Sequence, residues 1–345
     1  MDGSLIFPVA APPAPGETVP IAPGIHWLRM RLPFALNHIN LWLLEDGPGW
    51  TIVDCGYALD ETRDAWQRIF AERLGGRPVQ RIVVTHYHPD HIGFAGWLTE
   101  LWDAPMWTTE QEFRHASMHA HGTGGDGSEA LRRDFARRAG LDDESSMVFA
   151  VRQNNYRRGV PSLPAAYRRI GEGSRFEIGG REWRVLIGEG HAPEHACLYC
   201  AEAGVLIAGD QILPKISPNI SVQTYEPDGD PLSRYLASLA KLRAALPPDI
   251  LVLPSHNLPF FGLHQRIDEL AAHHRGRCDD ALTACARPTS AAELMPVLFR
   301  RQLDRHQMGF ALGEALAHLH YLERQGALIR ERGGDGVDRF VVSAQ

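Results

Sequence analysis

The sequence predicts an α+β protein in which sheets are flanked by helices, followed by a small domain of helices and a hairpin. Two successive rounds of short strands that end in a helix indicate the sheets, at residues 24–74 and 175–245. The chain changes character near residue 264, from where long helical patterns predominate. We therefore predict two domains, residues 1–263 and 264–345, which fits a chain of 345 residues.

The first round places its strands between Pro, Gly and Asn residues that are typical of turns. We predict strands at residues 24–31, 38–45, 50–54 and 81–85. Helical spacing of apolar residues predicts helices at 60–74, which ends before Gly75 and Gly76, and at 91–102. The first 23 residues are rich in Pro, Ala and Gly, and we expect them to form an extended arm.

Residues 110–170 have the pattern of a helical insertion with an excess of positive charge. Residues 131–169 contain nine arginines and four acidic residues. A solvated helical face accounts for this pattern, and so does a surface that binds an anionic substrate. The sequence leaves both interpretations open.

The second round and the C-terminal region follow the same logic. We predict strands at residues 175–178, 183–187, 196–200, 205–208 and 250–253, and helices at 230–245, 264–285 and 308–325. Ser290 and Glu293 match a capping box that opens one more helix. Residues 327–343 then have the pattern of a hairpin, so that the tail has the outline of a winged-helix module.

Composition excludes several classes of protein. The formal net charge of −7 disfavours a surface that binds polyanions everywhere, and five cysteines are too few for a disulfide framework. No apolar run approaches the length of a membrane-spanning helix. A secretory signal begins with basic residues, but residues 1–28 contain no Lys or Arg. We therefore expect a cytoplasmic protein that makes no contact with membranes.

A cluster of histidines carries the main chemical signal. The segment Thr85-His-Tyr-His-Pro-Asp-His91 offers four metal ligands in six positions at the end of a predicted strand. In an extended segment, residues two apart point to the same side, so His86 and His88 face one direction. Asp90 and His91 come after the turn and can face a neighbouring point. This geometry suits two metal ions about 3.5–4 Å apart.

The segment resembles the H-x-H-x-D-H signature of the metallo-β-lactamase superfamily. Further motifs of that superfamily occur in the expected order, over roughly residues 24–262. They are Val-Asp54-Cys-Gly, Gly-His191-Ala-Pro-Glu-His195, Ala-Gly-Asp210 and Pro-Ser-His256. The resemblance implies an αββα sandwich with a helical insertion at 110–170 and a winged-helix-like domain at the C-terminus.

The resemblance also implies roles for individual residues. One metal ion would take His86, His88 and His191, and a second would take Asp90, His91 and His256, with Asp210 bridging the two. Asp54 would support the ligands, Asp90 and His195 would take part in catalysis, and His195 would do so as a hydrogen-bond donor beside the site. Imidazole and carboxylate ligands suit two Zn²⁺ ions, with Fe or Mn as alternatives.

The function implied is hydrolysis of a thioester or ester by water activated between two metal ions, on a small anionic substrate. Two enzymatic alternatives stay open: an endoribonuclease or phosphodiesterase of the lactamase-β-like type, and a mononuclear iron persulfide dioxygenase. Nucleic acid is the less favoured partner, because eleven arginines and eleven acidic residues balance from residue 264 onward. The tail would then serve as a lid or in a homodimer. Glu194 departs from glyoxalase-II-like sequences, which have Gly there.

Overall fold

The computed structural model describes residues 5–121, 128–151, 156–300 and 302–343, and the chain divides into two units. The first unit consists of residues 1–122, 155–218 and 241–267. The second consists of residues 123–154, 219–240 and 268–345. Each unit therefore combines segments that are far apart in the sequence.

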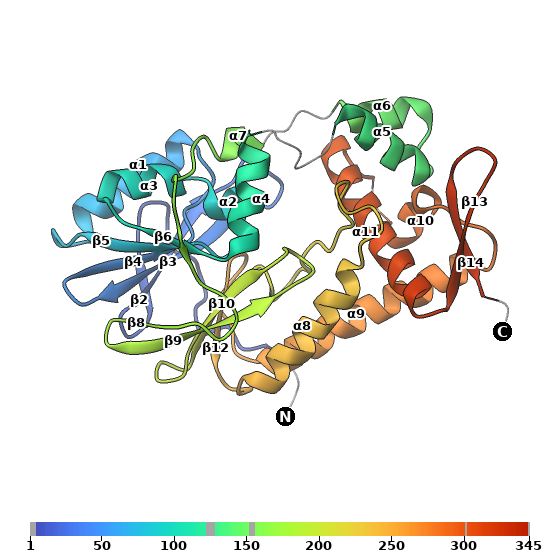
Figure 1. Ribbon diagram of the computed structural model, residues 1–345. Coiled ribbons are helices and arrows are strands. Elements are labelled where there is room, and N and C mark those ends of the chain that lie inside the picture. Colours follow the sequence, from blue (N-terminus) through green and yellow to red (C-terminus); the bar gives the residue numbers. More distant parts are fainter. Residues whose placement is uncertain (1–4, 122–127, 152–155, 301, 344–345) are drawn as a thin grey trace. The chain divides into compact units, whose positions relative to one another are not determined.

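The first sheet of the first unit has seven strands in sequence order (Figure 1). The strands are β1 (Val19–Ala22), β2 (Ile25–Arg31), β3 (His38–Asp46), β4 (Gly49–Val53), β5 (Val79–Val83), β6 (Met106–Thr108) and β7 (Arg168–Arg169). Strands β1 to β4 pair antiparallel, whereas β4 to β7 pair parallel. The carboxyl ends of β4 and β5 consequently lie at the same edge of the sheet.

The second sheet has five strands in the order β12-β11-β10-β9-β8. Their bounds are β8 (Arg175–Ile178), β9 (Arg181–Gly188), β10 (His195–Cys200), β11 (Val205–Gly209) and β12 (Leu251–Pro254). Only β11 and β12 pair parallel among the described strands of this sheet. Their carboxyl ends, like that of β4, are followed directly by polar residues, and after β5 the first polar residue is Thr85.

The alternation of side chains along the strands builds two apolar layers. Trp27 and Trp42 belong to a cluster with residues of the second sheet, such as Val185 and Ile207. Their neighbours Leu28 and Leu43 point to the opposite face and join a second cluster. Because successive residues of a strand face opposite sides, both faces of the first sheet are covered.

Helices cover the outer face of the first sheet (Figure 1). Trp66 of α1 (Asp60–Glu72) and Leu98 of α3 (Ala95–Trp102) are fully buried in the same cluster as Leu28. The indole N–H of Trp66 donates to the carbonyl of Cys55 at 2.9 Å, which satisfies a buried polar group. The first unit is thus a sandwich of two sheets with helices outside, as the sequence predicts.

One local prediction needs correction. The pattern over residues 91–102 predicts one helix, but α2 (Pro89–Ile92) and α3 are separate, and an added Cβ at Gly93 between them would meet three backbone carbonyls. The N-terminal arm is predicted to be extended, and within it residues 19–22 form β1 and pair with β2. All five cysteines are buried, and none forms a disulfide.

The second unit is mainly helical. It draws on α5 (Glu129–Arg138), α6 (Asp143–Ala150), α8 (Pro231–Ala245), α9 (Leu263–Ala284), α10 (Ala291–Leu298) and α11 (Arg305–Arg324), with the hairpin β13 (Leu328–Arg332) and β14 (Asp338–Val342). The predicted capping box of α10 is present, with Ser290 and Glu293 bonded reciprocally. Leu312, Leu316 and Leu319 of α11 are buried on one stripe, as their spacing predicts.

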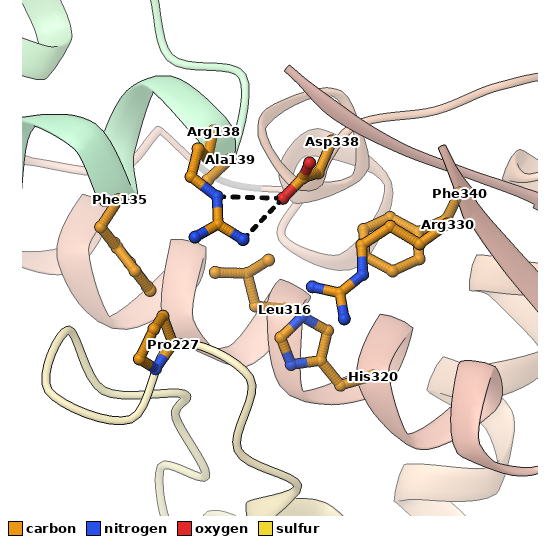
Figure 2. Close-up of a pocket in the computed structure, with 9 residues that line it drawn as sticks. All are labelled: Phe135, Arg138, Ala139, Pro227, Leu316, His320, Arg330, Asp338 and Phe340. Carbon is orange, nitrogen blue, oxygen red and sulfur yellow. Dashed lines mark hydrogen bonds and ion pairs between the residues drawn. The ribbon is translucent and has the colours of Figure 1, made fainter. Parts of the chain in front are cut away.

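The middle of the helical insertion, with α5 and α6, belongs to this second unit. Arg138 of α5 donates two hydrogen bonds to Asp338 of β14, at 3.1 and 3.2 Å (Figure 2). The backbone N–H of Ala292 donates to the carbonyl of Ala139 at 2.9 Å. Helix α4 (Glu110–His121) stays in the first unit. The units therefore do not follow a single boundary at residue 263, because these contacts tie the insertion to the C-terminal segment.

Within the described ranges, no helix is both long enough and apolar enough to cross a bilayer.

Glu314 of α11 gives the second unit a pH-dependent stability. Burial raises its pKa to about 7, although a hydrogen bond from Asn219 at 3.2 Å opposes the shift. The folded state then binds a proton that the unfolded chain, with a pKa of about 4.5, releases. The stabilisation from this proton is present below about pH 4.5 and is lost as the pH rises through about 7.

We predict that Glu314→Gln, which cannot titrate, removes this dependence. The free energy of unfolding of the wild type should fall relative to that of the variant between about pH 5 and pH 8. Denaturant titrations at several pH values measure the difference. The exposed Glu331→Gln is the control and should run parallel to the wild type. A constant difference for Glu314→Gln would contradict the prediction.

Candidate metal centre

Asp54 organises the edge of the first sheet. It follows β4 with a positive φ of 61°, a conformation that Asp adopts more readily than most residues. Its carboxylate accepts from the backbone N–H and the hydroxyl of Thr85 and from Nδ1 of His91, each at 2.8 Å. Because Nδ1 of His91 donates to the carboxylate, the lone pair of Nε2 is free to face a metal ion.

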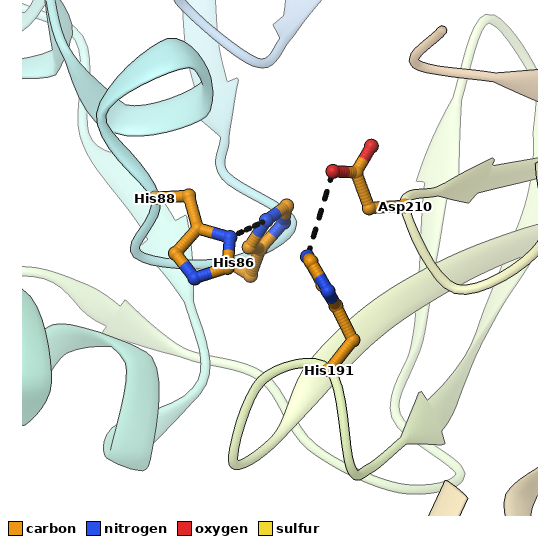
Figure 3. Close-up of side chains that lie close together, drawn as sticks. All are labelled: His86, His88, His191 and Asp210. Atoms are coloured by element: carbon orange, nitrogen blue, oxygen red, sulfur yellow. Dashed lines mark hydrogen bonds and ion pairs between the residues drawn. The ribbon is translucent and has the colours of Figure 1, made fainter. Parts of the chain in front are cut away.

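The first group of potential ligands contains His86, His88, His191 and Asp210. They come from the loop after β5, the loop after β9 and the end of β11, and Figure 3 shows them converging. One donor atom from each lies within 4.8 Å of the others. The hydroxyl of Thr85 gives its proton to Asp54, so it accepts from Nδ1 of His86 at 3.1 Å. The Nε2 atom of His86 is thereby left with a lone pair.

The second group contains Asp90, His91 and His256, again with donor atoms within 4.8 Å of one another. Asp90 and His91 lie on the short helix α2, and His256 follows β12. Nδ1 of His256 donates to the carbonyl of His38 at 2.8 Å, so Nε2 faces Asp90, 3.6 Å from Oδ2. This hydrogen bond plays the same part for His256 that Asp54 plays for His91.

Asp210 lies between the two groups. Its Oδ2 is 3.5 Å from Nε2 of His191, and its Oδ1 is 3.3 Å from Nε2 of His256 and 3.6 Å from Nε2 of His91. The structure thus brings together all seven side chains that the resemblance implies as ligands. A carboxylate in this position can offer one oxygen to each of two cations.

The electrostatics of the two groups suit divalent cations. Nε2 of His91 and Oδ1 of Asp210 are buried and make no hydrogen bond among the described residues. Burial, together with neighbouring histidines, lowers the pKa of His86 and of His88 well below the usual range. Neutral imidazoles are the form that binds a metal ion. Burial opposes charge on His91 too, but the carboxylates of Asp54 and Asp210 outweigh it and raise the pKa of His91.

His195 supports Asp210 and does not belong to either group. The resemblance implies a hydrogen-bond donor, but Nε2 of His195 accepts from the backbone N–H of Asp210 at 3.1 Å. Burial lowers the pKa of His195 to about 3, so the ring is neutral. The His195 ring is completely buried against Gly209. Gly209 has no side chain, so it leaves room for the ring.

Glu194, where the sequence departs from glyoxalase-II-like proteins, points to helix α4. Its carboxylate accepts from the backbone N–H of Gln111 at 3.0 Å, and its backbone carbonyl accepts from the hydroxyl of Thr109 at 2.9 Å. These contacts anchor the loop that carries His191 to the start of the helix.

Two supporting residues have only a weak signal in the sequence. Asn40 in β3 donates to the carbonyls of Pro254 and Asn257 at 2.8 and 2.9 Å, on both sides of His256. Its signal is a polar residue within the apolar middle of the strand. Glu112 lies three residues after Thr109, a spacing that predicts a local capping box. Its carboxylate instead contacts residues far away in the sequence.

Comparison with known proteins assigns both regions of the chain. The family model described as "Metallo-beta-lactamase superfamily" matches residues 36–256, and "Metallo-beta-lactamase-like, C-terminal domain" matches residues 278–343. A beta-lactamase domain protein from Burkholderia ambifaria is 46% identical, with a TM-score of 0.91 and 98% of each chain covered. A metallo-beta-lactamase family protein from Thermus thermophilus is 31% identical, with a TM-score of 0.79, covering 93% of this chain and 99% of that one.

A curated relative points in the same direction. "Probable metallo-hydrolase YqjP" of Bacillus subtilis is 24% identical over 307 residues, which cover 87% of this chain and 92% of the relative. The fold and the His/Asp groups together imply that the site holds divalent metal ions.

The contact between Gly209 and His195 generates a prediction. A Cβ added at Gly209 would lie 2.4 Å from the His195 ring, and φ is +53° there. Gly209→Ala should therefore add overpacking of about 1–3 kcal/mol to the backbone strain. Gly204→Ala is a matched control, because φ is +61° and nothing lies within 4 Å of the added Cβ. Chemical unfolding of the metal-free proteins compares the two, and equal losses of stability would contradict the role of the His195 contact.

Proposed function

Because the chain belongs to the metallo-beta-lactamase superfamily, we propose that it is a dinuclear metal hydrolase that cleaves a thioester or ester carbonyl. The observation that carries the proposal is the position of Asp210 between two groups of buried ligands. A single metal ion would use only one of the two groups of donors. Two ions with a shared carboxylate use them all.

The residues divide between two positions. His86, His88 and His191 would hold one ion, Asp90, His91 and His256 would hold the other, and Asp210 would contact both. The donor set of imidazole and carboxylate without cysteine suits Zn²⁺, and also Fe or Mn. When bound, two such ions lower the pKa of water toward neutrality and stabilise negative charge that develops on a substrate oxygen.

The remaining residues hold these donors in one geometry. Asp54 and the His38 carbonyl fix the tautomers of His91 and His256, and His195 holds the backbone of Asp210. Asp90 is the ligand carboxylate with the greater exposure, 18% against 9% for Asp210. It therefore lies on the side from which water and substrate reach the site.

We propose a thioester or activated ester as substrate because His195 cannot donate a proton to a leaving group. Its Nε2 accepts a backbone N–H, and burial keeps the ring neutral, so it cannot protonate a leaving group. A thiolate leaves without a proton, whereas the alkoxide of an unactivated phosphodiester benefits from one. This difference favours carbonyl substrates with a stable leaving group.

An anionic substrate is supported by Arg158 on α7 (Tyr156–Gly159). Burial and the charge of Asp90 raise the pKa of Tyr57, and the charge of Arg158 lowers it. Arg158 and Asp90 of α2 therefore both affect the pKa of the Tyr57 hydroxyl. Arg158 is exposed. A carboxylate or phosphate on the substrate can pair with its guanidinium.

Nucleic acid as substrate is disfavoured by the second unit. Its arginines near the hairpin are neutralised by acids: Arg330 contacts Asp228 at 2.7 Å and Glu323 at 3.0 Å, and Arg332 contacts Asp338 at 2.7 Å. Arg138, on the pocket of Figure 2, contacts the same Asp338. Cations that are already paired contribute little to phosphate binding.

We predict that the Zn²⁺-loaded protein hydrolyses an anionic thioester faster than a matched phosphodiester. His88→Ala should lower kcat/KM for the thioester by at least about 100-fold and reduce the bound metal, because a ligand is lost. Elemental analysis and initial rates measure both effects. His26→Ala is the control, since His26 lies on β2 and pairs with Glu45 outside both ligand groups.

Three results would overturn the proposal: turnover of the phosphodiester alone, turnover that a chelator leaves unchanged, or purified protein that binds no metal. RNA binding that depends on salt and on residues 264–345 would favour the nuclease alternative instead.

A further inference from the structure

Glu112 connects the two loops that carry the first group of ligands. One oxygen of its carboxylate accepts from the backbone N–H of Tyr87 at 2.9 Å, and the other accepts from the backbone N–H of Glu194 at 2.6 Å. Tyr87 stands between His86 and His88, and Glu194 follows His191 by three residues. We propose that Glu112 is a positioning residue that sets the distance between the His86/His88 loop and the His191 loop, an inference that rests on the proposed metal function.

The contact is rigid because helix α4 is anchored at the same point. Glu112 lies in the first turn of α4 and is completely buried. The N-terminus of a helix favours a carboxylate there, since its free N–H groups carry partial positive charge. Glu194 in turn accepts from the N–H of Gln111 in that turn, at 3.0 Å. Helix and loop therefore hold each other through reciprocal hydrogen bonds.

The peptide groups around Tyr87 are held from a second direction. Tyr156 of α7 donates its hydroxyl to the carbonyl of Tyr87 at 2.6 Å. The ring of Tyr87 stacks on His119 of α4, with centroids 5.3 Å apart and an angle of 9°. The backbone N–H and carbonyl of the residue between His86 and His88 are thus both bonded, and its side chain is packed.

These contacts act on the two ligand groups unequally. His86, His88 and His191 depend on the two loops that Glu112 joins. Asp54 orients His91, and the His38 carbonyl orients His256. In the part of the chain that the structure describes, Glu112 forms no hydrogen bond with either of these groups. Loss of the Glu112 contacts should therefore weaken the first metal position more than the second.

Both hydrogen bonds need acceptor atoms, and the two carboxylate oxygens of Glu112 provide one for each N–H group. Glu112→Gln keeps the size of the side chain but replaces one acceptor by an NH₂ group. That group would face a backbone N–H, donor against donor. The substitution therefore breaks one of the two contacts irrespective of pH.

The test is titration of the metal-free protein with Co²⁺, followed by visible absorption and by competition with a chelator. For Glu112→Gln we expect the affinity of the first position to fall by about 10–100-fold, the loss typical of residues that orient ligands, with a smaller change at the second. Tyr156→Phe, which removes one hydroxyl, should lower the affinity of the first position in the same direction by less.

Glu110→Gln is the matched control. Glu110 lies in the same turn of α4 but pairs with Arg114 and Arg169 at 2.6 and 2.7 Å, away from both loops. The Glu110→Gln variant should bind Co²⁺ at both positions with the affinity of the wild type. Denaturant unfolding of each metal-free variant separates an effect on metal binding from a loss of stability.

Wild-type affinity at both positions in Glu112→Gln would overturn the inference. Equal weakening at both positions, in proportion to lost stability, would overturn it too, because it indicates a purely structural role. In either case the proposed function stands if the wild type binds two metal ions and hydrolyses the thioester. A wild type that binds no metal would overturn both.

Discussion

The structure depends on holding the Asp210 carboxylate between two sets of imidazoles. Its two oxygens lie within 3.6 Å of histidines from three different loops. Burying so many ionisable groups is unfavourable unless opposite charges meet there. The fold meets this requirement by bringing carboxylates and imidazoles together at the site, where divalent cations complete the charge balance.

The two sheets deliver these residues because their strand ends meet at one edge of the sandwich. Backbone hydrogen bonds join the sheets directly at this edge, from Ala196 to Thr85 at 2.9 Å and from Asn40 to Ser255 at 2.7 Å. Each bond lies next to residues of the site, at His195, His86 and His256. These main-chain contacts hold the ends of the strands together at the edge where the ligands lie.

The residues that orient the ligands come from a wider set of elements than the ligands themselves. Asp54, Asn40 and Glu112 stand on or beside β4, β3 and α4. The carboxylates of Asp54 and Glu112 accept from an imidazole N–H and a backbone N–H at or beside a ligand. The side-chain amide of Asn40 donates to a backbone carbonyl near a ligand. Since a displaced ligand binds a metal ion less well, these contacts hold the ligands in place, although none of the three residues belongs to either ligand group.

The sequence by itself predicted most of the strands and helices and, through the resemblance, the seven side chains that the structure brings together. Alternating apolar residues between turn residues predict the strands, because that pattern depends on local geometry. The spacing of His86, His88, Asp90 and His91 predicts a two-metal site, and the resemblance to one family adds His191, Asp210 and His256. Only the tertiary structure decided that His195 accepts a hydrogen bond, that Glu112 joins two loops, and that residues 123–154 belong with the C-terminal segment. These features depend on contacts between residues up to 200 positions apart, such as Arg138 and Asp338, and no local pattern encodes them.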